Sequence, residues 1–526
     1  MRRIFGSLVL VALVVLAGCA QAPGLAPSPS DDGSTTPAPE GSTAATTAPG
    51  DASGATADAA RDVHPPDPAT DVLGWEDGYW YNESLAVNQS DGLNRSERRA
   101  VVARTMARVE KLRGLEFTKR VPVSIVSRSK LRADQRNRSS SAALRRFDNV
   151  KFEALFLVDR STDSIDVQQQ NAGSSVLGYY SPRKDAIVVV NDGGSLTLDE
   201  LTLAHELTHA LQDQQFNLTT YNRQTRDGAN AESGLIEGDA HYVETLYGRH
   251  CGGAWSCLQA GSNDSNGGNG EKSGNGGESG SLANVGIYLL KYQPYSDGPA
   301  FVQRVRNQGG WAAVNALYAD PPASTEQVIH PAKYGTDEPQ RPTVTDSHAS
   351  NWSRIDVSSR SDHASLGEAA LFSMFMYPAY ESDGRTQLFP ARSFFNYGPN
   401  GDLQTIDPLN YTSRYSAGWG GDTLVPYVDD RGQTGYVWKL TWDTERDATQ
   451  FVTGYRALLR FHDARRVSGH PNTWRIPANE SFGGAYAVSR RGETVVVVNA
   501  PTVSQLSQVR AGAGSPANST ANRTNG

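Results

Sequence analysis

Apolar positions in the first half of the chain switch between helical and strand-like spacing. In residues 96–113, Val102, Met106 and Val109 recur three or four positions apart, which predicts a helix with one buried face. Short apolar runs predict strands at residues 121–127, 154–158, 176–180 and 186–190. A Ser-Pro-Arg-Lys-Asp turn joins the last two, so we expect a β-hairpin whose edge could hold an extended peptide by strand addition.

Two longer helices are predicted after this hairpin. Thr197 and Glu200 have capping-box spacing, and a helical pattern continues from about residue 198 to 215. The second helix is predicted at residues 231–247. The apolar positions are Leu201, Ala204, Leu207, Thr208 and Leu211 in the first helix, and Ile236, Ala240, Val243 and Tyr247 in the second.

The second half of the chain has a different order of elements. Residues 298–318 read as two short helices broken at residues 308–310. Further helices are predicted at 366–377 and 443–459, and strands at 424–427, 436–442, 485–489 and 494–499. We expect an α+β fold in which residues 346–509 form an accessory α+β domain with Trp419, Trp438 and Trp442 in its core.

The N-terminal residues predict export, and three polar segments further along the chain predict flexibility. Residues 1–19 resemble a lipoprotein signal peptide, and the lipobox-like ending predicts that Cys19 carries a lipid anchor on the outer face of the membrane. An uncleaved anchor, and either the general or the twin-arginine export route, remain open. Residues 20–70 predict a disordered spacer, residues 261–280 a Gly/Asn/Ser-rich insertion and residues 510–526 a loose tail.

Charge and cysteine usage narrow the class of protein. The formal net charge is -8 and the basic residues are scattered, which argues against a nucleic-acid partner. Cys251 and Cys257 are close together in an exported chain, which predicts a local disulfide. Sequons that permit glycosylation occur at Asn82, Asn88, Asn94, Asn137, Asn217, Asn263, Asn351, Asn410, Asn479, Asn518 and Asn522.

The candidate chemistry lies in the helix predicted at 198–215. His205 and His209 are four residues apart, so both imidazoles share one helix face and can reach one metal ion. Glu206 lies between them and could accept a proton from a water that the metal activates. This pattern predicts a zinc site of the metallopeptidase type.

The remaining site residues are expected on later helices. Glu237, at the edge of a buried stripe, is our third zinc ligand, whereas Glu232 near the helix start could serve only the helix dipole. Asp239 and His241 are predicted to orient the ligating imidazoles. His330 is predicted to stabilise the oxyanion; Tyr334 and Tyr295 compete for this role, and His330 could instead cap a helix ahead of Pro331.

The segment from His205 to Phe216, followed by Leu235 to Ala240, resembles the gluzincin-type zinc peptidases, and more narrowly a family of metallopeptidases found as haloarchaeal cell-surface lipoproteins. Further likeness lies at residues 309–311, 321–331 and 418–422, so it covers most of the chain beyond about Val72. The resemblance implies a zincin-like domain over residues 71–345, with His205, His209 and Glu237 on zinc.

We therefore expect a surface-anchored zinc metallopeptidase whose partners are a peptide or protein substrate and the membrane. The alternative is a non-catalytic adhesion or envelope module that retains the fold and holds any zinc structurally. Glu206 separates the two hypotheses, because a structural zinc site needs no general base. The sequence leaves the substrate and the oligomeric state open.

Overall fold

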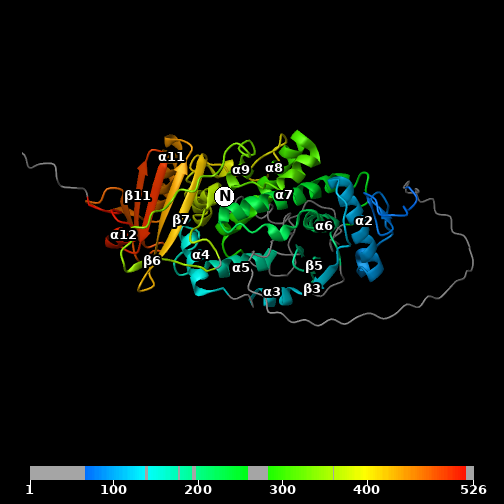
Figure 1. The fold of residues 1–526 in the computed structure, drawn as a ribbon, viewed down its shortest axis with the longest axis horizontal. Helices are drawn as coiled ribbons and strands as arrows, with labels where there is room; N and C mark the ends of the chain where they lie inside the picture. Colours follow the sequence, from blue (N-terminus) through cyan, green and yellow to red (C-terminus); the bar gives the residue numbers. More distant parts are fainter. Residues whose placement is uncertain are drawn as a thin grey trace, which may run out of the picture.

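The computed structural model describes residues 65–136, 140–175, 178–191, 197–258, 282–358 and 360–516. Cys19, the 261–280 insertion, most of the 20–70 spacer and the last ten residues lie outside this set. The described chain is α+β, as predicted (Figure 1). Among its helices, none combines the length and the apolarity that a membrane crossing requires.

Helices dominate the part of the structure that precedes residue 345. The helices are α2 (Arg95–Arg113), α3 (Arg128–Arg136), α4 (Ala142–Ala154), α5 (Ser164–Ser175), α6 (Glu200–Phe216), α7 (Arg226–His250), α8 (Val285–Leu317) and α9 (Thr325–Ile329), with 3₁₀ turns η1 (Gln89–Asp91) and η2 (Leu218–Thr220). The strands are β1 (Trp75–Glu76), β2 (Tyr79–Trp80), β3 (Val123–Val126), β4 (Gly178–Ser181) and β5 (Ala186–Val190).

The predicted hairpin forms two strands of a small sheet. Its order is β3-β5-β4, with β3 parallel and β4 antiparallel to the central β5. The hairpin prediction is confirmed, and β4 is an edge strand. Since α6 packs against β4, this edge lies beside the helix that carries His205 and His209.

Helix α6 has the predicted length but a different cap. Asp199, not Thr197, is the N-cap residue, and its carboxylate accepts the Thr202 N–H at 2.9 Å. The predicted capping box is wrong because Glu200 is recruited elsewhere. Both oxygens of its fully buried carboxylate are bound by Arg104 of α2, at 3.0 and 2.9 Å.

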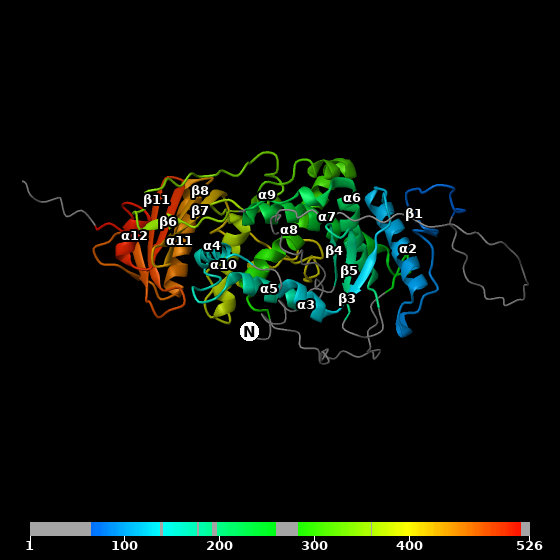
Figure 2. The same cartoon turned by 60° about the horizontal axis from the view of Figure 1, so that its bottom comes forward.

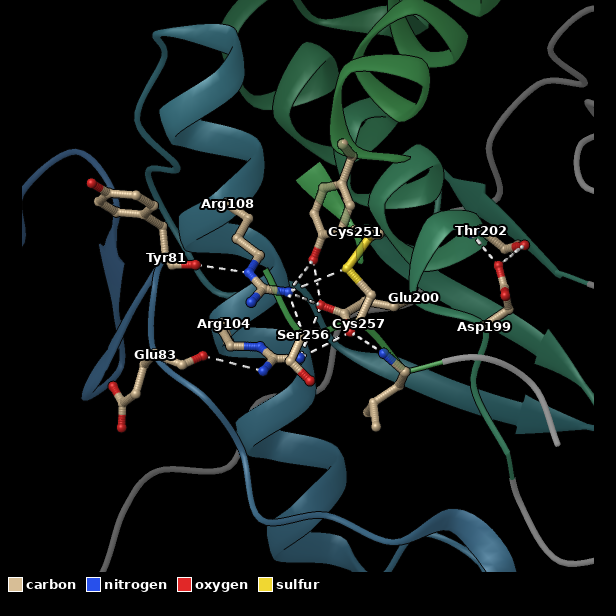
Figure 3. The surroundings of a disulfide bond; sticks show 12 residues. Tyr81, Glu83, Arg104, Arg108, Asp199, Glu200, Thr202, Cys251, Ser256 and Cys257 are labelled. Carbon is tan, nitrogen blue, oxygen red and sulfur yellow. Dashed lines mark hydrogen bonds and ion pairs between the residues drawn. A yellow bond between two sulfur atoms is a disulfide. The ribbon is translucent and has the colours of Figure 1, made fainter. Parts of the chain in front are cut away.

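Figure 3 shows how this buried carboxylate joins α2, α6 and a disulfide-closed loop. Arg108 also donates to Glu200, at 2.6 Å, and reaches the sulfur of Cys257 at 3.8 Å. The backbone N–H of Leu258 completes the set at 2.7 Å. The predicted Cys251–Cys257 disulfide is present and holds this loop against the start of α6.

The strand predicted at residues 154–158 is wrong. Helix α4 ends at Ala154, and the chain then turns through Phe156, whose φ is 54°. The N–H of Leu157 returns to the carbonyl of Phe152 at 3.1 Å. These side chains are apolar because they are buried in a tight turn, a setting that their local pattern does not distinguish from a strand.

Helices α7 and α8 cross at glycines. A Cβ placed on Gly238 would lie 2.4 Å from the carbonyl carbon of Gly298, so the two backbones touch at this point. Helix α8 begins at Val285, well before the predicted start, and continues through Pro294 and Pro299. The predicted break is confirmed, since Gly309 and Gly310 have non-helical angles.

The C-terminal part is a seven-stranded sheet with helices on both faces (Figures 1 and 2). Its strand order is β6-β7-β8-β12-β11-β10-β9, with antiparallel pairing throughout. The helices are α10 (Gly367–Glu381), α11 (Glu445–Phe461) and α12 (Val503–Val509), with the 3₁₀ turn η3 (Ala391–Phe394). The strands are β6 (Trp352–Arg354), β7 (Trp419–Asp429), β8 (Thr434–Trp442), β9 (Arg465–Arg466), β10 (Thr473–Ile476), β11 (Gly484–Arg491) and β12 (Thr494–Ala500).

One hydrophobic cluster joins this sheet to the earlier helices. Trp419, Trp438 and Trp442 are buried in it, as predicted. The same cluster includes side chains of α4, α8, α10 and α11, so one face of the sheet is covered by helices from both halves of the chain. The other face packs on α12 through Leu506 and Val509.

The α7–α8 crossing gives a stability prediction. Gly238→Ala places a methyl group against the Gly298 backbone, which cannot rotate away, so we expect a loss of about 1–3 kcal/mol in the free energy of unfolding. Gly248→Ala in the same helix is the matched control, because its Cβ would meet only Leu201 at 3.6 Å. Chemical denaturation of both variants tests this. Equal stability of Gly238→Ala and the parent would contradict the close approach.

Candidate metal centre

Three side chains converge between α6 and α7. Nε2 of His209 lies 3.1 Å from Nε2 of His205 and 3.1 Å from Oε2 of Glu237, and the remaining separation, from Nε2 of His205 to Oε2 of Glu237, is 3.4 Å. Two donors bound to one tetrahedral zinc at 2.0–2.1 Å would lie about 3.3 Å apart. The three distances therefore fit one zinc ion held by the three predicted ligands.

The outward-facing imidazole nitrogens have their own acceptors. Nδ1 of His209 lies 2.9 Å from Oε1 of Gln212, whose amide nitrogen donates to the Ile236 carbonyl at 3.0 Å. Because this second bond fixes which end of the amide is oxygen, Nδ1 of His209 must be the donor. Nδ1 of His205 lies 3.0 Å from Oε2 of Glu244. Each Nε2 atom then carries a lone pair, and the two lone pairs face each other.

Three electron-rich atoms at this distance need a positive charge between them. Glu237 is 1% exposed, and its Oε1 has no hydrogen-bond partner in the described residues. Burial alone would raise the pKa of Glu237, but His209 and then His205 lower it to about 2. Burial lowers the pKa of His209, yet Glu237 outweighs it and the net shift is upward. The donor set thus fits a metal cation, and zinc in particular suits two imidazoles and a carboxylate.

Glu206 follows His205 directly and is hydrogen-bonded to strand β4. Its Oε2 accepts the backbone N–H of Tyr180 at 2.6 Å. Tyr180 pairs with Ile187, whose own N–H points to β3, so this N–H of β4 faces away from the sheet. The Tyr180 hydroxyl donates to Asp213 of α6 at 2.8 Å, which fixes the hairpin on the helix. The backbone edge of β4 and the Glu206 carboxylate therefore meet.

The two predicted orienting residues have different positions. His241 lies 2.8 Å from Oε2 of Glu244, the oxygen that also meets His205, so it acts through Glu244. Asp239 was expected near the imidazoles, and this expectation is wrong. Its buried carboxylate accepts from Arg113 at 3.0 and 3.1 Å and from the Tyr318 hydroxyl at 2.7 Å. Asp239 instead fixes α7 to the end of α2.

The candidates for oxyanion stabilisation have other partners. His330 is the C-cap residue of α9, and its Nε2 lies 3.0 Å from Oε2 of Glu368 on α10. The structure thus pairs His330 with Glu368 rather than with the three donors, which matches the alternative capping role. The Tyr334 hydroxyl donates to the Asp320 carbonyl at 2.6 Å. Tyr295 stacks on Tyr292, with ring centroids 6.0 Å apart.

Three side chains were given no role from the sequence, although Glu244 was one of the acids on the second helix from which Glu237 was preferred. Gln212 is three residues beyond His209, so helical spacing places it on the face of the ligand that it supports. Glu244 is seven residues beyond Glu237 on α7 and supports His205 of α6 instead. The third is the hydroxyl of Tyr292, which is buried and has no hydrogen-bond partner among the described side chains. Burial, then Tyr288 and Glu244, raises its pKa. No local pattern marks Tyr292, because α8 lies far along the chain.

Another group of carboxylates already has a cation. Glu326, Asp337 and Asp443 could hold a metal by proximity. However, the ammonium of Lys333 lies 2.6, 2.8 and 2.7 Å from them. This cluster is an ion-pair network that links the region after α9 to the start of α11.

Comparisons with known proteins identify part of the C-terminal sheet. The family model described as a domain of unknown function, DUF8575, matches residues 353–510. The match covers the region from β6 to α12 and does not include the donors on α6 and α7. Searches of curated proteins and of solved structures find no significant match.

The geometry predicts one zinc per chain. We expect purified protein to contain about one equivalent of zinc, and His205→Ala and Glu237→Ala to lose it, because each removes one of three donors. Glu232→Gln is the control on the same helix, since Glu232 pairs with Arg223 at 3.3 Å. Elemental analysis by mass spectrometry measures the stoichiometry. Undiminished zinc in His205→Ala would remove the basis for this centre.

Proposed function

We propose that this chain is a zinc-dependent metallopeptidase with a zincin-like N-terminal domain, anchored through Cys19 to the outer face of the membrane. The observation that carries the proposal is the position of Glu206. It is adjacent in sequence to the ligand His205, and its Oε2 accepts the backbone N–H of Tyr180 in β4 at 2.6 Å. Glu206 is not one of the grouped donors His205, His209 and Glu237, and a carboxylate that lies beside a zinc site without being a ligand suits a general base.

The substrate would lie along β4 as an added strand. On this edge Tyr180 turns its N–H toward Glu206, and Gly178, two residues earlier, faces the same way because successive residues of a strand alternate. A peptide bound in this way would present its backbone carbonyls to α6. Since strand addition uses main-chain hydrogen bonds, it requires no particular side chain in the substrate.

Different residues of the chain would take part in different steps of hydrolysis. A bound zinc ion would polarise the scissile carbonyl and lower the pKa of the attacking water. The Glu206 carboxylate takes a proton from that water as the new C–O bond forms. It then delivers the proton to the leaving nitrogen, and the C–N bond breaks to give a carboxylate product and a free amine. Gln212 and Glu244 keep both Nε2 atoms directed at the ion.

A specific observation favours a second function. His205, His209 and Glu237 are 4%, 6% and 1% exposed, a degree of burial that also suits a structural zinc. In that case the chain is a non-catalytic adhesion or envelope module, and Glu206 serves only to fasten β4 to α6. Access of substrate to the donors separates the two functions.

Replacement of the base tests catalysis directly. Glu206→Gln keeps the size of the side chain but removes its basicity, so we expect a loss of about two to four orders of magnitude in cleavage of unfolded protein substrates. Zinc content and thermal stability should match the parent. Fluorogenic casein or a peptide library monitored by mass spectrometry provides the assay.

Glu244→Gln is the matched control, because it perturbs a ligand without touching the base. We expect about 10–100-fold weaker zinc affinity and recovery of activity at saturating zinc. Glu206→Gln should not recover. If the parent and Glu206→Gln cleave equally, the peptidase proposal fails; if the zinc-loaded parent cleaves nothing, the structural function takes its place.

A further inference from the structure

A second group of acidic side chains lies on α8, α10 and the loop before β7. Asp297 of α8 is 5% exposed and Glu368 of α10 is fully buried, while Asp407 lies half-buried in the loop between η3 and β7. These three carboxylates come from segments that are far apart in sequence. After burial, Asp407 and then Glu368 raise the pKa of Asp297, so the tertiary fold brings the three acids near one another.

Local contacts hold the loop of Asp407 on α8. The Ser296 hydroxyl donates to the Leu409 carbonyl at 3.0 Å and lies 3.0 Å from the Leu409 N–H. The side-chain amide of Asn396 donates to the backbone carbonyl of Asp407 at 3.0 Å, and Asp407 has a positive φ of 61°. Asp407 is thereby fixed next to Asp297, which follows Ser296 in the helix.

Several buried oxygens of this cluster have no hydrogen-bond donor among the described residues. Within the described residues, no hydrogen bond reaches Oδ2 of Asp297, Oδ1 of Asp407 or either carboxylate oxygen of Glu368, which meets His330 at 3.0 Å without hydrogen-bond geometry. Gln293 lies one helical turn before Asp297 and is 0% exposed, and both atoms of its amide are also unpaired. A buried amide without a partner costs roughly 1–3 kcal/mol, so several such groups at one place indicate a missing ligand.

Another buried acid, Asp422, shows how this protein hydrogen-bonds a buried carboxylate. Asp422 is also buried, but it accepts from the N–H groups of Leu366 and Gly367, the Ser365 hydroxyl and the Trp438 indole, at 2.9 to 3.1 Å. The group at Asp297 has no comparable donors. The ammonium of Lys333, which acts on Glu368, is engaged by three other carboxylates.

We propose that Asp297, Asp407 and the side-chain oxygen of Gln293 bind a hard divalent cation, with Glu368 as a further acid beside them. All candidate donors are oxygens, which suits Ca²⁺ rather than zinc, and Ca²⁺ tolerates an irregular set completed by water. Asp407 gives the ion a route from solvent, because it is the partly exposed member. Nothing in this site depends on the peptidase proposal.

The position of the ion indicates its role. Asp297 precedes Gly298, which touches the backbone of α7 at Gly234 and Gly238, next to the zinc ligand Glu237. An ion shared by α8 and the Asp407 loop would hold that crossing in place. Without a cation, burial and mutual repulsion raise the pKa of Asp297, and burial raises that of Asp407 to about 6, so the competing arrangement is a pair of acids that shares a proton.

Terbium luminescence tests the site on the full zinc-loaded chain. Tb³⁺ replaces Ca²⁺ at oxygen sites, and Tyr411 and Tyr292, whose pKa values both respond to Asp297, are near enough to sensitise it. We expect a saturable signal at pH 7.5 that Ca²⁺ displaces, and a thermal midpoint that rises with Ca²⁺. Asp297→Asn and Asp407→Asn should weaken binding at least about tenfold.

Two controls locate the signal. Asp337→Asn alters a carboxylate that Lys333 neutralises, and His205→Ala alters the zinc centre, so both should retain the luminescence. If Ca²⁺ changes neither the thermal midpoint nor the luminescence of the parent, the acids share a proton or hold a buried water, and the proposal is overturned. This outcome does not depend on whether the aspartate variants fold. Unchanged binding in both aspartate variants would overturn it as well.

Discussion

Two imidazole lone pairs and a carboxylate face one another between α6 and α7, and the contacts around them depend on this arrangement. His205, His209 and Glu237 present two imidazole lone pairs and a carboxylate to a common point, with all separations between 3.1 and 3.4 Å. A cation at that point would convert the repulsion into attraction. The surrounding contacts make sense as devices that keep these donors together: Gln212 and Glu244 fix the rings, and the Tyr180 amide fixes Glu206.

Buried ion pairs hold the two helices from outside. Arg104 and Arg108 of α2 bind Glu200 at the start of α6, and Arg113 of the same helix binds Asp239 of α7. One helix thereby positions both donor-bearing helices through three guanidinium groups. Removal of one partner from such a buried pair is strongly destabilising, typically about 3–5 kcal/mol, because the other charge is left uncompensated. The glycine crossing of α7 and α8 supports the opposite side of α7.

Local patterns in the sequence were sufficient to predict the three donor residues but not the side chains that surround them. His205, Glu206 and His209 lie within one helical turn, and the edge of an apolar stripe pointed to Glu237. Asp239 was misassigned because its partner Arg113 is 126 residues away, a separation that helical spacing cannot reveal. The cap of α6 was misassigned for the same reason, since Arg104 recruits Glu200 across 96 residues. The buried turn after Ala154 looked like a strand because burial, not pairing, explains its apolar residues.

The central claim is that one zinc ion lies between the inward-facing atoms of His205, His209 and Glu237. Anomalous diffraction from crystals of the zinc-loaded protein, measured on both sides of the zinc absorption edge, tests it most directly. We expect one strong peak within about 2.2 Å of Nε2 of both histidines and of Oε2 of Glu237. A peak instead at Nδ1 of His205 with His241 and Glu244, the neighbouring group that could hold a metal, would contradict it.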